Sequence, residues 1–96
     1  MATVERKVKI PNTQGLHARP AAQFVELANR YGSTIDVSNG SKSVDAKSIM
    51  NVLLLVGTMG TVLTIRADGD DAQAAVDALV NLVADGFGEM EDDEVG

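Results

Sequence analysis

The sequence has no cysteine and no tryptophan, and it contains a single histidine among 96 residues. Without cysteine the chain can form no disulfide framework and perform no thiol chemistry. One histidine without cysteine makes a poor set of soft metal ligands, so we expect no bound metal and no cofactor. Aromatic side chains make up only 3% of the chain and no basic face is evident, which argues against a nucleic-acid partner.

Long apolar runs are also missing. The longest, "VLLLVG" at residues 52–57, is far too short to span a bilayer. The first ten residues lack an apolar stretch behind a basic start, so we expect no signal peptide, no membrane association and a cytoplasmic location. A length of 96 residues with 45% hydrophobic side chains fits one globular domain.

Negative charge is concentrated at the end of the chain. The net charge is −6, and five carboxylates lie between residues 89 and 94. Residues 1–88 are therefore close to neutral. We expect residues 1–88 to form the domain and residues 89–96 to form a flexible acidic tail.

Hydrophobic periodicity predicts an alternation of strands and helices. Apolar residues recur with period two in the strands and with the spacing i, i+3, i+4, i+7 in the helices. The expected strands are 3–10, 33–38, 41–46 and 60–68, and the expected helices are 18–30, 48–56 and 71–85. Asn39-Gly40 predicts a tight hairpin turn, because both residue types accept a positive φ. The order βαββαβα predicts an α+β fold, with a four-stranded, mostly antiparallel sheet and three helices on one face.

The segment "GLHARPAA", residues 15–22, carries the only histidine. Pro20 is tolerated only in the first turn of a helix, so the helix should begin at or just after His17. A helix N-terminus binds anions through its unpaired N–H groups, here those of Ala18 and Arg19, and the Arg19 guanidinium suits phosphate oxygens. A neutral imidazole at that position could carry a phosphoryl group. The plainer alternative is a solvated surface histidine.

Three segments together resemble the HPr family, the histidine-containing phosphocarriers of the bacterial phosphoenolpyruvate-dependent phosphotransferase system. These segments are "GLHARPAA", "AKSIMNVLLL" and "GTVLTIRADGDDAQAAVDALVNLV", and the similarity covers about residues 3–88. The resemblance implies an open-faced β-sandwich. It also implies that His17 takes a phosphoryl group on Nδ1 from phosphorylated enzyme I and passes it to an enzyme IIA domain. Arg19 would assist the transfer, and the protein would act as a carrier rather than turn over alone.

The same resemblance assigns a regulatory role to Ser48. In the family a serine at this position is phosphorylated by an HPr kinase/phosphorylase, and phosphate at a helix N-terminus need not unfold the helix. The alternative is an ordinary helix N-cap. Asn51 stands where the family usually has glycine.

Four neighbouring residues match positions that bind partners in the family: Lys47, Ile49, Met50 and Leu53. With His17 and Arg19 they would form a docking face. The alternative is that Ile49 and Leu53 belong to the core, since both lie on the apolar stripe of their helix. Met50 lies off that stripe, and methionine suits a surface with several partners.

A second functional reading stays open beside the carrier. Some relatives act mainly as regulators through partner binding, including a nitrogen-related branch, which the ending "GFGEMEDDE" resembles. A third reading is a binding module in which His17 is incidental. In each case we expect a monomer.

Overall fold

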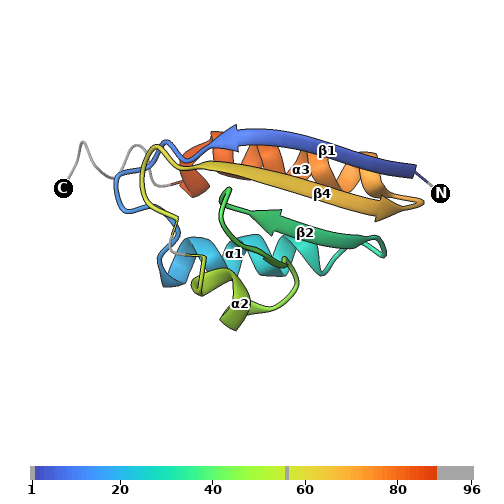
Figure 1. Ribbon diagram of the computed structural model, residues 1–96, viewed down its shortest axis with the longest axis horizontal. Helices are drawn as coiled ribbons and strands as arrows, with labels where there is room; N and C mark the ends of the chain where they lie inside the picture. The colour runs from blue at the N-terminus through green and yellow to red at the C-terminus, as the bar shows by residue number, and fades with distance from the viewer. Residues whose placement is uncertain (1, 56, 89–96) are drawn as a thin grey trace.

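The computed structural model describes residues 2–55 and 57–88 (Figure 1). The predicted element order is confirmed. The strands are β1 (Ala2–Lys9), β2 (Thr34–Ser38), β3 (Ser43–Asp45) and β4 (Val62–Gly69), and the helices are α1 (Ala18–Ala28), α2 (Ile49–Leu53), α3 (Ala72–Ala84) and the 3-10 turn η1 (Gly86–Gly88). The predicted acidic tail, and the predicted helical position of Val56, lie outside the described residues.

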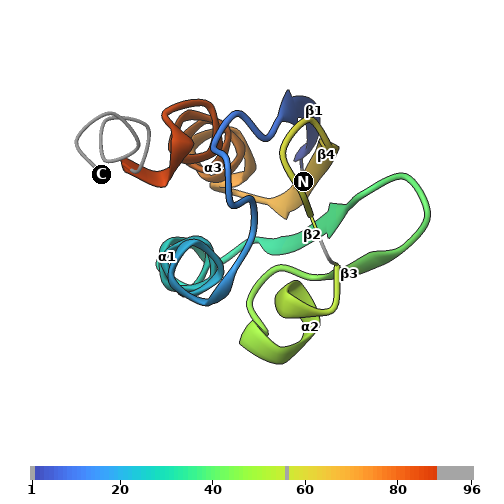
Figure 2. The ribbon, with the colours of Figure 1, turned by 90° about the vertical axis from the view of Figure 1, so that its left-hand side faces the viewer.

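The four strands form one antiparallel sheet in the order β1-β4-β2-β3. The helices cover a single face of it, with α1 and α3 side by side and α2 next to α1 and β3 (Figure 2). The predicted open-faced α+β architecture is therefore confirmed.

The core lies between the sheet and the helices. Strand β4 alternates as predicted, with Leu63, Ile65 and Ala67 buried and the residues between them turned to the open face. Phe24 of α1 is fully buried, and burial of one such side chain contributes about 2–3 kcal/mol. The apolar pattern of the last helix predicts a buried stripe of Ala72, Ala75, Val76, Leu79, Leu82 and Val83. Helix α3 buries these residues except Leu82, which is half-buried, and it buries Val80 in addition.

Arg6 interrupts the apolar face of β1, and its partner is a carboxylate on α3 that the sequence pattern does not show. It lies on the edge strand, opposite Ile65 of β4. Its Nη1 atom is 3.2 Å from Oδ1 of Asp77 on α3, and both side chains are about half exposed. A charge at this position is therefore paired at the rim of the core, and a charged edge strand also resists pairing with other chains.

The predicted two-residue hairpin turn is wrong. Ser38 pairs with Ser43, so the β2–β3 loop has four residues, and of Asn39 and Gly40 only Gly40 has a positive φ (97°). The Asn39 side chain explains the longer loop. Its Oδ1 accepts from the backbone N–H groups of Ser41 and Lys42, and its Nδ2 donates to the carbonyl oxygen of Leu55 at 2.7 Å.

Two helices end earlier than predicted. Helix α1 stops at Ala28 rather than at residue 30, because Asn29 caps it and donates from Nδ2 to the carbonyl oxygens of Val25 and Lys47. Helix α2 stops at Leu53, short of the predicted end at residue 56. In both cases a tertiary contact or a tight turn, which periodicity does not show, sets the end of the helix.

Candidate functional site

His17 is the N-cap residue of α1, as the position of Pro20 predicts. Its backbone is extended (φ −88°, ψ −170°), and its carbonyl oxygen accepts the first helical hydrogen bond, from the N–H of Ala21 at 2.9 Å. The residue is half-buried. The hydrogen bond from Ala21 thus holds the backbone of His17 to the helix, while the residue remains partly accessible to solvent.

The loop before His17 is closed by Asn12, which the sequence pattern did not single out. Asn12 is buried, and its Nδ2 donates to the carbonyl oxygen of Gly15 at 3.0 Å, while the Gly15 N–H donates back to the carbonyl of Asn12 at 3.2 Å. Gly15 has a φ of 67°. The pair Pro11-Asn12 could have indicated a turn here, but it gave no sign that the Asn12 side chain is buried.

This loop is also held against the chain that links α2 to β4. The Leu16 N–H donates to the carbonyl oxygen of Gly57 at 2.7 Å. Farther from His17, Ile10 donates to the Thr61 carbonyl at 2.9 Å and accepts from the Gly60 N–H at 2.8 Å. The histidine loop is therefore anchored at both of its ends.

The start of α1 has the chemistry of an anion site. The N–H groups of Ala18 and Arg19 belong to the first turn, where no preceding helical carbonyl can accept them. Pro20, the third helical residue, is buried and has no N–H to offer. The Arg19 side chain is exposed and carries a planar set of donors. An oxyanion beside the imidazole would be met by two amides and a guanidinium.

Within residues 2–55 and 57–88 there is no group of acidic or histidine side chains able to hold a metal ion.

A second feature is an exposed apolar surface on α2, here called the α2 patch: Ile49, Met50, Leu53 and Leu54. Their exposed fractions are 37%, 69%, 37% and 57%, whereas Val52 on the same helix is fully buried. Ile49 and Leu53 are thus exposed, and the alternative that they belong to the core is wrong. Leu54 was not predicted for this surface, because the helix was expected to continue past it.

Lys47, which the sequence places in the docking face, has a bound ammonium group. Its Nζ donates to the carbonyl oxygen of Tyr31 at 2.7 Å, three residues beyond the end of α1. An 11-residue helix is about 16 Å long, so the ammonium group is bound at the end of α1 that is remote from His17.

Ser48 is the N-cap residue of α2. Its Oγ accepts a long hydrogen bond from the N–H of Asn51 at 3.5 Å, and the residue is half-exposed. The geometry is that of an N-cap, and the residue is not buried, so both sequence readings stay open.

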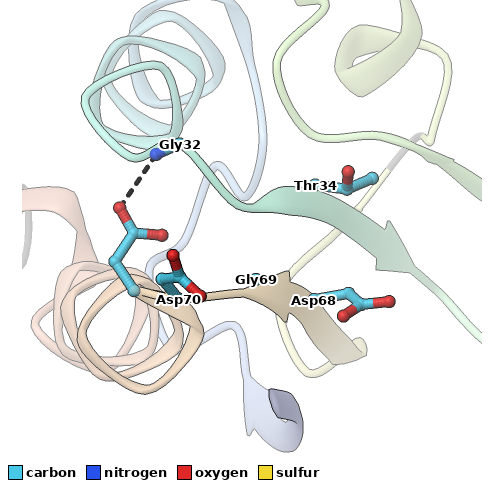
Figure 3. A pocket seen from close by; sticks show the side chains of 6 residues that line it. Gly32, Thr34, Asp68, Gly69 and Asp70 are labelled. Atoms are coloured by element: carbon cyan, nitrogen blue, oxygen red, sulfur yellow. Dashed lines mark hydrogen bonds between the residues drawn. The ribbon is translucent and has the colours of Figure 1, made fainter. Parts of the chain in front are cut away.

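A pocket at the far end of α1 is lined by Gly32, Thr34 and residues 68–71 (Figure 3). The dashed line there is the hydrogen bond from the Gly32 N–H to Oδ2 of Asp71, at 2.8 Å. Oδ1 of Asp71 accepts from both the N–H and the hydroxyl of Ser33. These bonds, that of the Ser33 hydroxyl above all, hold the pKa of Asp71 below its ordinary value. The pocket contains no residue of the His17 site, and its polar groups connect α1, β2 and α3.

Comparison with known proteins places these features in a family. Residues 4–85 match the family model described as "PTS HPr component phosphorylation site". The phosphocarrier protein HPr of Cupriavidus necator is 43% identical over 88 residues, which cover 92% of this chain and 99% of that protein.

Solved structures agree in both fold and sequence. An HPr from Thermoanaerobacter tengcongensis superposes with a TM-score of 0.86 at 45% identity, covering 90% of this chain and 97% of that one. The Bacillus subtilis protein Crh, described as a swapped dimer, gives a TM-score of 0.69 at 41% identity, with coverages of 86% and 95%. No helix among the described residues is long and apolar enough to cross a membrane. By sequence and by structure, the chain belongs to the HPr family of phosphocarriers of the phosphotransferase system.

Proposed function

We propose that this protein accepts a phosphoryl group on His17 from phosphorylated enzyme I and passes it to an enzyme IIA domain. The observation that carries the proposal is the position of His17 as N-cap of α1, directly before the first-turn amides of Ala18 and Arg19. In support, the imidazole belongs to the residue that caps these two amides, and Arg19 supplies a guanidinium from the same turn of the helix.

The transfer follows from that arrangement. A ring nitrogen of neutral His17, Nδ1 by family resemblance, attacks the phosphorus of the donor's phosphohistidine. The new N–P bond forms as the donor's N–P bond breaks, and the electron pair of that bond returns to the donor ring. The Ala18 and Arg19 amides and the Arg19 guanidinium stabilise the charge on the phosphoryl oxygens. A second displacement of the same kind, with a histidine of enzyme IIA as the nucleophile, restores His17.

The α2 patch is the proposed docking surface for both partners. Met50 is the most exposed of its four side chains, and Ile49, Leu53 and Leu54 extend the apolar area around it. Exposed apolar area of this kind favours association, and methionine adapts to partners of different shape. We leave the predicted contact Lys47 out of this docking surface, because its ammonium group donates to the carbonyl oxygen of Tyr31.

Regulation through Ser48 is a separate proposal. Phosphate on the Ser48 hydroxyl would add negative charge at the start of α2, directly beside the α2 patch. That charge would oppose the docking of an acidic partner surface. The predicted monomer and the predicted cytoplasmic location remain predictions.

A mainly regulatory role is the second candidate, and the similarity to Crh favours it. In that case partner binding through the α2 patch, with or without phosphate on Ser48, would be the activity. The Crh structure is also a dimer, so sedimentation at micromolar concentration should accompany the functional tests.

Phosphorylation in vitro tests the proposed carrier. The protein is incubated with enzyme I, phosphoenolpyruvate and Mg²⁺, the metal being required by enzyme I chemistry. Intact-mass measurement should show a gain of one phosphate that is lost in acid and absent from His17→Ala. A gain that survives in His17→Ala, or no gain at all, would exclude the carrier function and leave the regulatory candidate.

A further inference from the structure

Two glycines bring the histidine loop and the chain after α2 into backbone contact. A Cβ atom placed on Gly15 would lie 2.3 Å from the carbonyl oxygen of Gly57 and 2.9 Å from Cα of Thr58. Both neighbours are backbone atoms, which cannot rotate aside as a side chain can. Any side chain at Gly15 must therefore push the two segments apart.

Gly57 is also closely surrounded, in its case by side chains. A Cβ atom there would lie 2.8 Å from Cδ1 of Ile10 and 3.0 Å from Cδ1 of Leu16. Gly57 and Leu16 are both buried, and the Leu16 N–H donates to the Gly57 carbonyl at 2.7 Å. The approach of the two backbones and this hydrogen bond form one unit, here called the 15–57 contact.

The 15–57 contact sits directly before the reacting residue. Leu16 precedes His17, and the His17 carbonyl is held by the Ala21 N–H. The backbone of His17 is thus fixed between the 15–57 contact and the first turn of α1. On the other side, Gly57 comes shortly after the α2 patch, so the contact also relates the proposed docking surface to the imidazole.

We infer that Gly15 and Gly57 are positioning residues for phosphoryl transfer: their contact fixes the reach of His17 relative to a partner docked on the α2 patch. This inference rests on the proposed function. In-line transfer requires the attacking nitrogen and the phosphorus to be aligned, and a displacement of about 1 Å can reduce the rate about 100-fold. Because neither glycine belongs to the α2 patch, loss of the contact should slow transfer without weakening docking.

Gly15→Ala tests the inference, with Gly40→Ala and Gly88→Ala as matched controls. The φ angles of the three glycines are 67°, 97° and 77°, so alanine is strained at each, but a Cβ on Gly40 or Gly88 meets nothing within 4 Å. The expected result is a fall of about 100-fold in kcat for transfer from enzyme I in Gly15→Ala, with KM unchanged and both controls close to wild type. A folded Gly15→Ala protein with the kcat of the controls would overturn the inference.

Gly57→Ala provides a second test with a built-in rescue, and it decides the matter if Gly15→Ala does not fold. The nearest atom to the new methyl group is Cδ1 of Ile10, which Ile10→Val removes. The single variant should lower kcat, and Gly57→Ala/Ile10→Val should recover part of it. Equal kcat values in wild type and Gly57→Ala would count against the inference.

Amide exchange separates this inference from the proposed function. Hydrogen exchange of the Leu16 N–H, followed by NMR, should accelerate in Gly15→Ala and not in Gly88→Ala. Unchanged Leu16 exchange in Gly15→Ala would contradict the positioning role even if no phosphoryl transfer is found. If wild-type protein accepts no phosphoryl group, the proposed function fails by itself.

Discussion

Ser33 donates two hydrogen bonds to Oδ1 of Asp71, one from its backbone N–H at 3.0 Å and one from its hydroxyl. The N–H of Gly32 donates to the other carboxylate oxygen at 2.8 Å. Ser33 lies just before β2 and Asp71 just before α3, so one carboxylate ties together segments that are 38 residues apart. Rather than capping its own helix, as an aspartate in this position often does, Asp71 joins the two halves of the fold.

The first prediction concerns the pH dependence of stability. The pKa of Asp71 is lowered in the folded state from an ordinary value of 3.8, first by the Ser33 hydroxyl and then by the Gly32 N–H. A carboxylate whose pKa is depressed on folding stabilises the protein above its unfolded pKa, and this contribution is lost as pH falls through the folded pKa. Asp71→Asn should therefore be less stable than wild type at pH 7, and the difference should shrink as the pH falls below 3.8.

Urea unfolding at a series of pH values measures this difference. Asp70→Asn is the matched control, because it removes a neighbouring carboxylate that is exposed. A stability difference for Asp71→Asn that stays constant from pH 7 to below 3.8 would contradict the assigned role of the carboxylate.

Lys47→Ala should act on stability more than on partner binding. Its Nζ donates to the Tyr31 carbonyl, and loss of one such hydrogen bond costs about 1 kcal/mol. The KM for phosphorylated enzyme I should stay near the wild-type value, in contrast to what the sequence alone predicts for Lys47. Lys42→Ala, an exposed lysine in the β2–β3 loop, is the control. A large rise in KM with unchanged stability would restore Lys47 to the docking surface.

Met50→Ala should weaken docking. Met50 is 69% exposed, the most exposed side chain of the α2 patch, and a loss of about 1.4 kcal/mol of binding free energy on its truncation raises KM about tenfold. The value of kcat should change little, since the His17 loop is untouched. Val62→Ala removes exposed apolar area from the open face of the sheet and should leave KM unchanged. Equal effects of the two variants would mean that the α2 patch is not the docking surface.

Incubation with an HPr kinase and ATP tests the proposed regulation. Phosphorylation of Ser48 should give an acid-stable gain of one phosphate that is absent from Ser48→Ala. Asn51→Gly, which restores the usual family residue, should be phosphorylated faster, but it should destabilise α2 by about 1 kcal/mol because glycine is a poor helix former. If wild type and Asn51→Gly both remain unmodified, Ser48 is only an N-cap.

Local patterns were sufficient to predict the elements and their order. The alternation in β4 and the apolar stripe of α3 are each visible within a dozen residues, and both faces were assigned correctly apart from Val80 and Leu82. Pro20 located the start of α1 because the reason is local: a proline cannot be accommodated deeper in a helix. The position of His17 at the start of α1 could therefore be predicted, because it depends only on residues that are close in sequence.

Contacts between distant segments account for what the sequence did not show. Asn39 looked like a turn residue, but its side chain reaches the Leu55 carbonyl, and this reshapes the hairpin. Lys47 was predicted as a partner-binding residue, but its ammonium group donates to the carbonyl oxygen of Tyr31. The link between Leu16 and Gly57 has no sequence signal beyond the two glycines. Each of these depends on the completed tertiary structure.

A pulse–chase transfer tests the central claim most directly. The protein is labelled with enzyme I and radioactive phosphoenolpyruvate, separated from both, and mixed with an enzyme IIA domain. The account predicts that label appears on His17, is absent from His17→Ala, and moves to the IIA domain without added phosphoenolpyruvate. Label that stays on the chain, or that resides on any residue other than His17, would contradict it.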